Sequence, residues 1–106
     1  MKPAPFMFAR PGSVEEALAL LQAGGDDAKV LAGGQSFVPL LNLRIASVDA
    51  VVDLNRLSEL AYIKRDTDTL CIGAMTRHRQ VEVSEEVKTT QPLLARVAAE
   101  VGHLAI

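Results

Sequence analysis

Two glycines, an amide and a hydroxyl follow one another at Gly33, Gly34, Gln35 and Ser36. They stand between a short apolar run and a segment typical of a helix start. Glycine permits a sharp turn with positive φ and a close approach of the backbone to a ligand, because it has no Cβ. A helix start adds unpaired N–H groups and a partial positive charge. The segment is therefore suited to a phosphate or pyrophosphate, and backbone amides make a lysine unnecessary.

The same residues also have a plainer interpretation. Gly-Gly pairs are common in turns, and a serine in the position of Ser36 is a common helix cap. The spacing is neither GxGxxG nor that of a P-loop, so neither of those sites is predicted. The residues alone leave open a pyrophosphate site, a site for a smaller nucleotide or inorganic phosphate, and an ordinary strand-to-helix turn.

Other reactive side chains give weaker signals. Cys71 lies in the middle of a predicted strand, so we expect a buried thiol and no redox centre. His78 and His103 are too far apart in sequence for a metal-ligand spacing, and His78 is expected at the surface. Asp49 and Asp53 flank a strand without a second carboxylate at catalytic spacing. We predict no catalytic residue and no metal ligand.

The double glycine is preceded and followed by elements that would hold it in place. Residues 29–32 and 51–54 are short apolar runs typical of buried strands, and residues 36–43 indicate a short helix. Strand, helix and strand in this order predict a parallel βαβ unit with a right-handed crossover.

A further helix is predicted ahead of this unit. Ser13, with Glu16 three residues later, forms a capping box. Apolar residues then recur at i, i+3, i+4 and i+7 from Val14, and Gly24-Gly25 is expected to end the helix. We expect an amphipathic helix packed on the sheet.

The second half of the chain predicts a hairpin followed by helices. Residues 62–65 and 69–74 flank an Asp-Thr-Asp turn, and we expect both strands to join the first sheet. Thr76 is expected to cap a helix over residues 76–83. Two more helices are predicted to start at Ser84 and at Gln91-Pro92.

The last predicted helix carries an apolar stripe. Its members recur at i, i+3, i+4 and i+7: Leu94, Val97, Ala98 and Val101. The stripe continues to Ala105, and Ile106 is followed by no polar tail. This pattern predicts a sequence cut from something longer, with an exposed stripe that is available for self-association.

Composition limits the class of protein further. A chain of 106 residues, with 49% hydrophobic residues and a net charge of -2, predicts one modest globular domain. No apolar run reaches the roughly 18 residues of a membrane span. Few aromatics and no basic cluster argue against nucleic-acid binding. One cysteine excludes an intrachain disulfide and a self-contained iron-sulfur site, and the N-terminus lacks a secretory pattern, so we expect a cytoplasmic protein.

Three stretches of the sequence carry a resemblance to a known family: KPAPFMFARPGSVEEALALL, LAGGQSFVPLLNLR and IGAMTRHRQVE. Over essentially the whole chain they resemble the FAD-binding medium subunit of molybdenum hydroxylases, the relatives of carbon monoxide dehydrogenase, aldehyde oxidoreductase and xanthine dehydrogenase. The resemblance implies an α/β (α+β) fold, a small mixed, partly parallel sheet of three to four strands with flanking helices. It would be the first subdomain of a PCMH-type FAD-binding domain.

The resemblance also implies a site for FAD. In the family, the loop that matches Ala32, Gly33, Gly34, Gln35 and Ser36 cradles the FAD pyrophosphate. Val30 and Leu31 would line it, and Val101 matches a position that contacts the flavin. A second glycine-rich stretch of the TIGG type is expected soon after the position of Ile106. Residues 1–106 would then be a truncated N-terminal part, in which FAD binds less tightly than in the parent subunit.

The family's scheme implies a role in electron transfer. Substrate would be oxidised on a large molybdopterin subunit, a small iron-sulfur subunit would carry the electrons, and FAD would pass them to an external acceptor. No substrate chemistry is expected on this chain. The alternative is a truncated or orphan fragment that acts as an interaction module without a cofactor.

Overall fold

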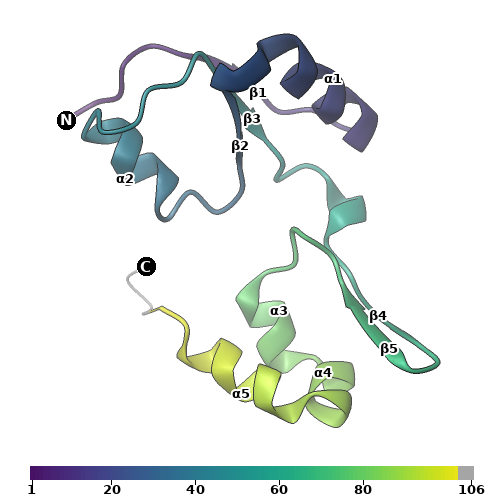
Figure 1. The fold of residues 1–106 in the computed structure, drawn as a ribbon. Coiled ribbons are helices and arrows are strands. Elements are labelled where there is room, and N and C mark those ends of the chain that lie inside the picture. Colours follow the sequence, from purple (N-terminus) through teal and green to yellow (C-terminus); the bar gives the residue numbers. More distant parts are fainter. Residues whose placement is uncertain (103–106) are drawn as a thin grey trace. The chain divides into compact units, whose positions relative to one another are not determined.

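The computed structural model describes residues 1–102 of the chain. The chain divides into two compact units, Met1–Leu57 and Ser58–Ile106. In Figure 1 the first unit is coloured from purple to teal and the second from teal to yellow. Within residues 1–102, no helix is long and apolar enough to cross a membrane.

The first unit is built on three parallel strands, β1 (Met7–Ala9), β2 (Ala28–Leu31) and β3 (Ala50–Asp53). Their order is β1-β3-β2, so β3 is the central strand (Figure 1). The short helix α2 (Phe37–Asn42) connects β2 to β3. The predicted parallel βαβ unit is therefore confirmed, and β1 adds a third strand to its sheet.

The predicted first helix is confirmed as α1 (Val14–Gly24). The Ser13 hydroxyl oxygen accepts a hydrogen bond from the Glu16 N–H (3.1 Å), and the Glu16 carboxylate accepts one from the Gly12 N–H (3.1 Å). Gly25, with φ of 64°, ends the helix and donates its N–H to the Leu21 carbonyl. A 3-10 turn, η1 (Gly25–Asp27), leads into β2.

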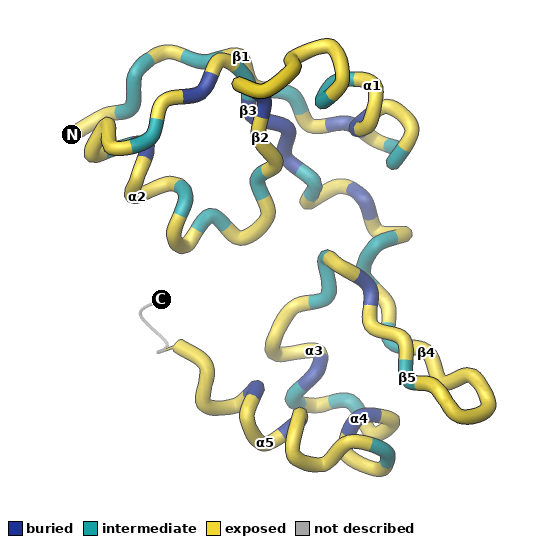
Figure 2. Tube along the Cα trace, in the orientation of Figure 1, coloured by how far each residue is buried: buried dark blue, intermediate teal, exposed yellow. Residues whose placement is uncertain are grey.

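Burial in the first unit is concentrated on the central strand. Val51 and Val52 of β3 are each 1% exposed, and β3 is mostly dark blue in Figure 2. Val51 packs with Leu41 and Val48. The expectation that the first predicted strand is buried was wrong, because Val30 of β2 is 47% exposed. β2 is an edge strand, so its side chains lack the neighbours that cover β3.

The second unit begins with the 3-10 turn η2 (Ser58–Leu60) and a hairpin, β4 (Ile63–Asp66) and β5 (Thr69–Ile72). The hairpin is antiparallel, as expected, but it forms a sheet of its own, so the prediction that its strands join the first sheet was wrong. Ile63 and Leu70 instead pack against a cluster of helix residues: Val81, Val87, Ala95 and Ala98. The helices therefore cover the apolar face of the hairpin, so this face does not need a neighbouring strand or sheet.

Cys71 corrects another expectation, because its side chain is exposed. Successive side chains of a strand point to opposite faces. Leu70 packs against the helix cluster, so its neighbour Cys71 lies on the other face of the hairpin.

Three helices complete the second unit: α3 (His78–Val83), α4 (Glu85–Thr90) and α5 (Pro92–Glu100). The Ser84 hydroxyl oxygen caps α4 by accepting from the Val87 N–H (3.3 Å), as predicted. Thr76 is not a helix cap, because its hydroxyl accepts from the Tyr62 N–H (3.2 Å) and donates to the Tyr62 carbonyl (3.0 Å). Thr76 is thus bonded to the residue before β4, and α3 starts two residues later than predicted.

The apolar stripe of α5 is only partly buried. Ala98 of the stripe and Ala95 face the helix cluster, whereas Leu94, Val97 and Val101 remain exposed. The helix ends at Glu100, and Gly102 follows in the left-handed region with φ of 75°. The expected continuation of the stripe to Ala105 lies outside the described residues.

Candidate functional site

The double glycine lies in the loop between β2 and α2, at the carboxyl end of the parallel sheet. We call residues 32–36 the glycine loop. In open α/β sheets, ligands bind beyond the carboxyl ends of the strands, where loops and helix starts converge. The loop therefore stands at the edge of the first unit that is best placed to bind a small molecule.

The two glycines have different structural roles. Gly34 has φ of 74°, and an added Cβ would lie 2.9 Å from Val38 Cγ2 and 3.2 Å from Leu31 Cδ1. The turn therefore requires glycine at this position, as expected. Gly33 is outside the positive-φ region, so the expectation that both glycines serve the turn was wrong for Gly33. An added Cβ at Gly33 would meet nothing closer than Gln35 Cγ at 4.0 Å, so the absent side chain leaves this face of the loop open.

The glycine loop offers a run of free backbone donors. Within residues 1–102, the N–H groups of residues 33–37 make no hydrogen bond to another part of the chain. The first helical bonds of this segment come later, from Val38 N–H to the Gly34 carbonyl (3.0 Å) and from Leu40 N–H to the Ser36 carbonyl (3.3 Å). Such a run of amides, next to an open backbone face, can bind the oxygens of a phosphate group.

The plainer interpretation of Ser36 as a helix cap is not supported. Ser36 occupies the N-cap position of α2, but its side chain accepts no capping hydrogen bond, and its backbone is helical, not extended. An N-cap serine normally has extended backbone dihedrals. The Ser36 hydroxyl and the exposed Gln35 amide therefore remain available to a ligand at the loop.

A polar network, which the sequence patterns did not reveal, is hydrogen-bonded to the first residue of the glycine loop. Asp53 ends β3 and is 2% exposed. Its Oδ2 accepts from Arg10 Nε (3.1 Å) and Nη2 (2.9 Å), and its Oδ1 accepts from the Asn55 backbone N–H (2.8 Å) and side-chain amide (2.6 Å). The Asn55 amide also donates to the Ala32 carbonyl (2.9 Å). The network thus joins the ends of all three parallel strands.

The charge of Asp53 is maintained by these partners. Burial by itself would raise the pKa of this carboxyl group, because burial penalises the charged form. The hydrogen bonds from Asn55 and Arg10, together with the Arg10 charge, outweigh this effect and lower the pKa of Asp53 below its ordinary value of 3.8. The Asp53 carboxylate is therefore ionised at neutral pH.

The remaining site predictions fall at different places in the fold. Val30 and Leu31 are the last residues of β2, directly before the loop, with Val30 exposed and Leu31 half-buried. Val101 belongs to the second unit, where it follows α5 and is 51% exposed. Val101 is therefore not a core residue of the second unit.

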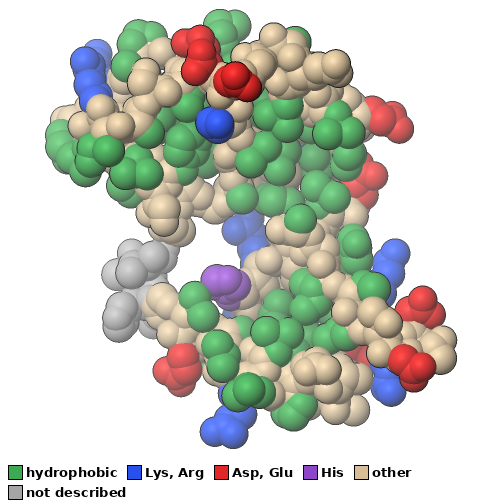
Figure 3. Space-filling model, viewed as in Figure 1, with side chains coloured by type: hydrophobic (Ala, Val, Ile, Leu, Met, Phe, Trp, Pro, Cys, Tyr) green, Lys and Arg blue, Asp and Glu red, His purple; other side chains and the backbone are tan. Residues whose placement is uncertain are grey.

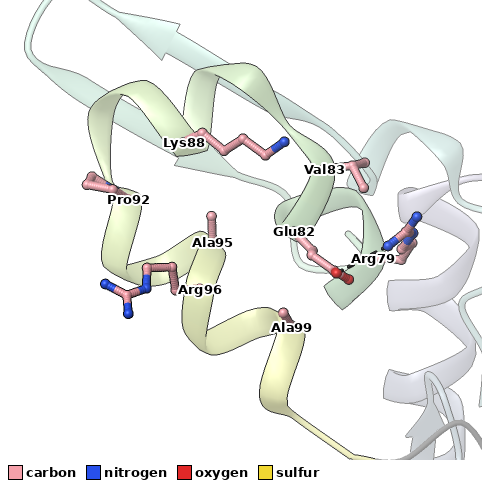
Figure 4. Close-up of a pocket in the computed structure, with 8 residues that line it drawn as sticks. All are labelled: Arg79, Glu82, Val83, Lys88, Pro92, Ala95, Arg96 and Ala99. Atoms are coloured by element: carbon pink, nitrogen blue, oxygen red, sulfur yellow. Dashed lines mark ion pairs between the residues drawn. The ribbon is translucent and has the colours of Figure 1, made fainter.

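The second unit has a surface hollow of its own among α3, α4 and α5, with a volume of about 560 Å³. Figure 4 shows the residues that line it: Arg79, Glu82, Val83, Lys88, Pro92, Ala95, Arg96 and Ala99. Arg79 is paired with Glu82 (3.2 Å) across one side of the hollow. In Figure 3, apolar side chains are widespread on the drawn face of this unit, with charged side chains dispersed among them.

The side-chain types that bind metal ions do not gather in the described part of the chain. Among residues 1–102, no group of three or more His, Cys, Asp or Glu side chains is placed to hold a metal ion. His78, at the start of α3, is exposed, as expected. The other histidine, His103, lies outside the described residues.

Comparison with known proteins identifies the family. The family described as the FAD binding domain in molybdopterin dehydrogenase matches residues 4–106. The chain belongs to this family of FAD-binding domains. The resemblance inferred from the three sequence stretches is confirmed, and the alternative of a module without a cofactor is not favoured.

Curated relatives are similar in sequence to this chain over nearly its whole length. The chain is 47% identical over 103 residues to the 6-hydroxypseudooxynicotine dehydrogenase complex subunit alpha of Paenarthrobacter nicotinovorans, covering 97% of this chain and 35% of the relative. It is 44% identical over 98 residues to the carbon monoxide dehydrogenase medium chain of Hydrogenophaga pseudoflava, covering 92% and 34%. The chain therefore spans about a third of the length of these relatives.

Solved structures of the family confirm the α/β fold class. The chain matches a carbon monoxide dehydrogenase from Hydrogenophaga pseudoflava that lacks the Mo-pyranopterin moiety of its cofactor, with a TM-score of 0.94 and 41% identity over 99% of this chain and 37% of that one. It matches quinoline 2-oxidoreductase from Pseudomonas putida 86 with a TM-score of 0.91 and 36% identity, over 99% and 36%.

Proposed function

We propose that the glycine loop binds the pyrophosphate of FAD in the medium subunit of a molybdenum hydroxylase. The observation that carries this proposal is the run of free N–H groups at residues 33–37, beside the open backbone face of Gly33. A pyrophosphate needs several donors and a close backbone approach, and the loop offers both. The residues present therefore fit the group that the family binds.

The residues of the site divide the work of binding. The amides of Gly33, Gly34, Gln35 and Ser36 would donate to the phosphate oxygens, and Gly34 would maintain the turn that gathers them. Val30 and Leu31 would line the site on the strand side. The contact of Val101 with the flavin stays a prediction. These contacts would hold and orient the cofactor, and no residue of this chain would transform a substrate.

The proposed role is electron transfer within a larger assembly. When bound, FAD accepts electrons and delivers them to an external acceptor. The electrons would come from a small iron-sulfur subunit, which would receive them from a large molybdopterin subunit where substrate is oxidised. The names of the relatives support this proposal, because they designate a medium chain and a subunit of a dehydrogenase complex.

Self-association through α5 stays a prediction, which sedimentation at rising protein concentration would test.

The direct test is the flavin content of the full-length subunit carrying Gly33→Val. A β-branched side chain would occupy the open face of the loop, and we expect the purified variant to lose most of its FAD. Gly12→Ala is the matched control, because an added Cβ at Gly12 also meets nothing within 4 Å but lies outside the loop. Wild-type FAD content in Gly33→Val would refute the proposal.

A further inference from the structure

We propose that Asn55 is a positioning residue for FAD, because it fixes the peptide group between Ala32 and Gly33. The inference rests on the proposed function of the glycine loop and adds a residue to it. Asn55 lies after β3, 23 positions beyond Ala32 in the sequence, and it donates its side-chain amide to the Ala32 carbonyl at 2.9 Å. No other hydrogen bond reaches this carbonyl from the described part of the chain.

Because the peptide group is planar, a hydrogen bond to the Ala32 carbonyl also sets the direction of the Gly33 N–H. In a trans peptide, the C=O of one residue and the N–H of the next point in opposite directions. With the Ala32 carbonyl held toward Asn55, the Gly33 N–H is aimed away from Asn55. Asn55 therefore sets the direction of the first free donor in the loop without needing to touch the ligand.

The peptide group between Ala32 and Gly33 needs a restraint, because Gly33 has no side chain to limit its rotation. A peptide flip between Ala32 and Gly33 changes ψ of Ala32 and φ of Gly33, and glycine populates positive and negative φ about equally. The open space around Gly33 offers no steric resistance to a flip. The hydrogen bond from Asn55 supplies the restraint that the absent side chain cannot.

Asn55 is itself held in place by the polar network. Its amide also donates to Asp53 Oδ1 (2.6 Å), and its backbone N–H donates to the same oxygen (2.8 Å). The other oxygen of Asp53 is bound by Arg10 through two nitrogens, at 2.9 and 3.1 Å. One Asn55 side chain thus connects a buried, charged anchor to the backbone of the binding loop.

Titrations of the full-length apo-subunit with two probes test the inference. ADP carries a pyrophosphate, whereas riboflavin carries a flavin without phosphate. We expect Asn55→Ala to raise the Kd of ADP about tenfold, the effect of one misdirected hydrogen bond to charge, and to leave the Kd of riboflavin unchanged. Asn55→Gln, which keeps the amide donor on a longer side chain, should recover part of the ADP affinity.

Controls separate positioning from loss of structure. Asn42→Ala removes an asparagine of the same unit whose side chain makes no hydrogen bond in the described residues, and both Kd values should stay at the wild-type level. If Asn55→Ala does not fold, Asn55→Ser replaces it, since serine is too short to reach the Ala32 carbonyl. Wild-type ADP affinity in the Asn55 variant would overturn the inference, and so would an equal loss of riboflavin and ADP affinity.

The failure of the inference can be distinguished from that of the proposed function. If Gly33→Val abolishes ADP binding while the Asn55 variant binds ADP normally, the loop binds the pyrophosphate and Asn55 does not position it. If Gly33→Val binds ADP as tightly as wild type, the proposed function fails, and the role of Asn55 fails with it.

Discussion

Asp53 and Arg10 join the ends of two neighbouring parallel strands through a forked ion pair, in which Oδ2 of the carboxylate accepts from both Nε and Nη2 of the guanidinium. Arg10 directly follows β1, and Asp53 is the last residue of β3. A carboxylate this deeply buried has to be paired, because an unpaired buried charge is strongly destabilising.

The lowered pKa of Asp53 predicts a dependence of stability on pH. A group whose pKa is lower in the folded than in the unfolded state stabilises the fold above its unfolded pKa, and this contribution is lost as the pH falls through the folded pKa. We expect Asp53→Asn to reduce the free energy of unfolding by about 2 kcal/mol at pH 7. The difference from wild type should shrink as the pH falls below 3.8.

Urea unfolding of both proteins between pH 7 and pH 2.5 would measure this difference. Asp49→Asn is the matched control, because Asp49 is also an aspartate next to β3 but has an exposed side chain. A difference between wild type and Asp53→Asn that stays constant over the whole range would contradict the prediction.

The unequal roles of the two loop glycines predict unequal effects on stability. Gly34→Ala places a Cβ at positive φ and 2.9 Å from Val38 Cγ2, so we expect a loss of about 2 kcal/mol in the free energy of unfolding. Gly33→Ala meets no close neighbour and should change stability by less than about 0.5 kcal/mol. Chemical denaturation of both variants checks the prediction, and equal losses at the two positions would show that it is wrong.

Gly73 is expected to be the least replaceable glycine of the second unit. An added Cβ would overlap the Leu60 carbonyl oxygen and lie 2.9 Å from Tyr62 Cδ1. The Gly73 N–H also donates to the Tyr62 carbonyl (2.8 Å), so the backbone has little freedom to move away. We expect Gly73→Ala to cost about 3 kcal/mol, as overpacking does in tight sites. Thermal unfolding of Gly73→Ala and of the control Gly12→Ala would measure this loss of stability. Equal unfolding midpoints of the two variants would contradict the prediction.

The exposure of Cys71 predicts a thiol that reacts in the folded protein. Cys71 is the one cysteine of the sequence, so a thiol reagent reports on it alone. We expect Ellman's reagent to label one equivalent of thiol in the native protein. The labelling rates of native and urea-unfolded protein should differ by less than about tenfold. Labelling that requires unfolding would show that the thiol is buried.

Local patterns predicted much of the secondary structure, because capping and turns depend on neighbouring residues. Ser13 and Glu16 start α1, Ser84 caps α4, and Pro92 opens α5, as their positions in the sequence indicate. The glycine loop was found in the same way, since a double glycine between an apolar run and a helix is a local signal.

The sequence by itself predicted the strand, the glycine loop and the helix that follows it, and its resemblance to known proteins indicated the family. Only the tertiary structure decided that Val30 is exposed on an edge strand, that Cys71 faces away from the helices, and that the hairpin forms a separate sheet. It alone brought Arg10, Asp53 and Asn55 together beneath the loop. The longest-range of these contacts join Arg10 to Asp53, 43 positions apart, and Asn55 to Ala32, 23 positions apart, and neither periodicity nor capping rules can encode them.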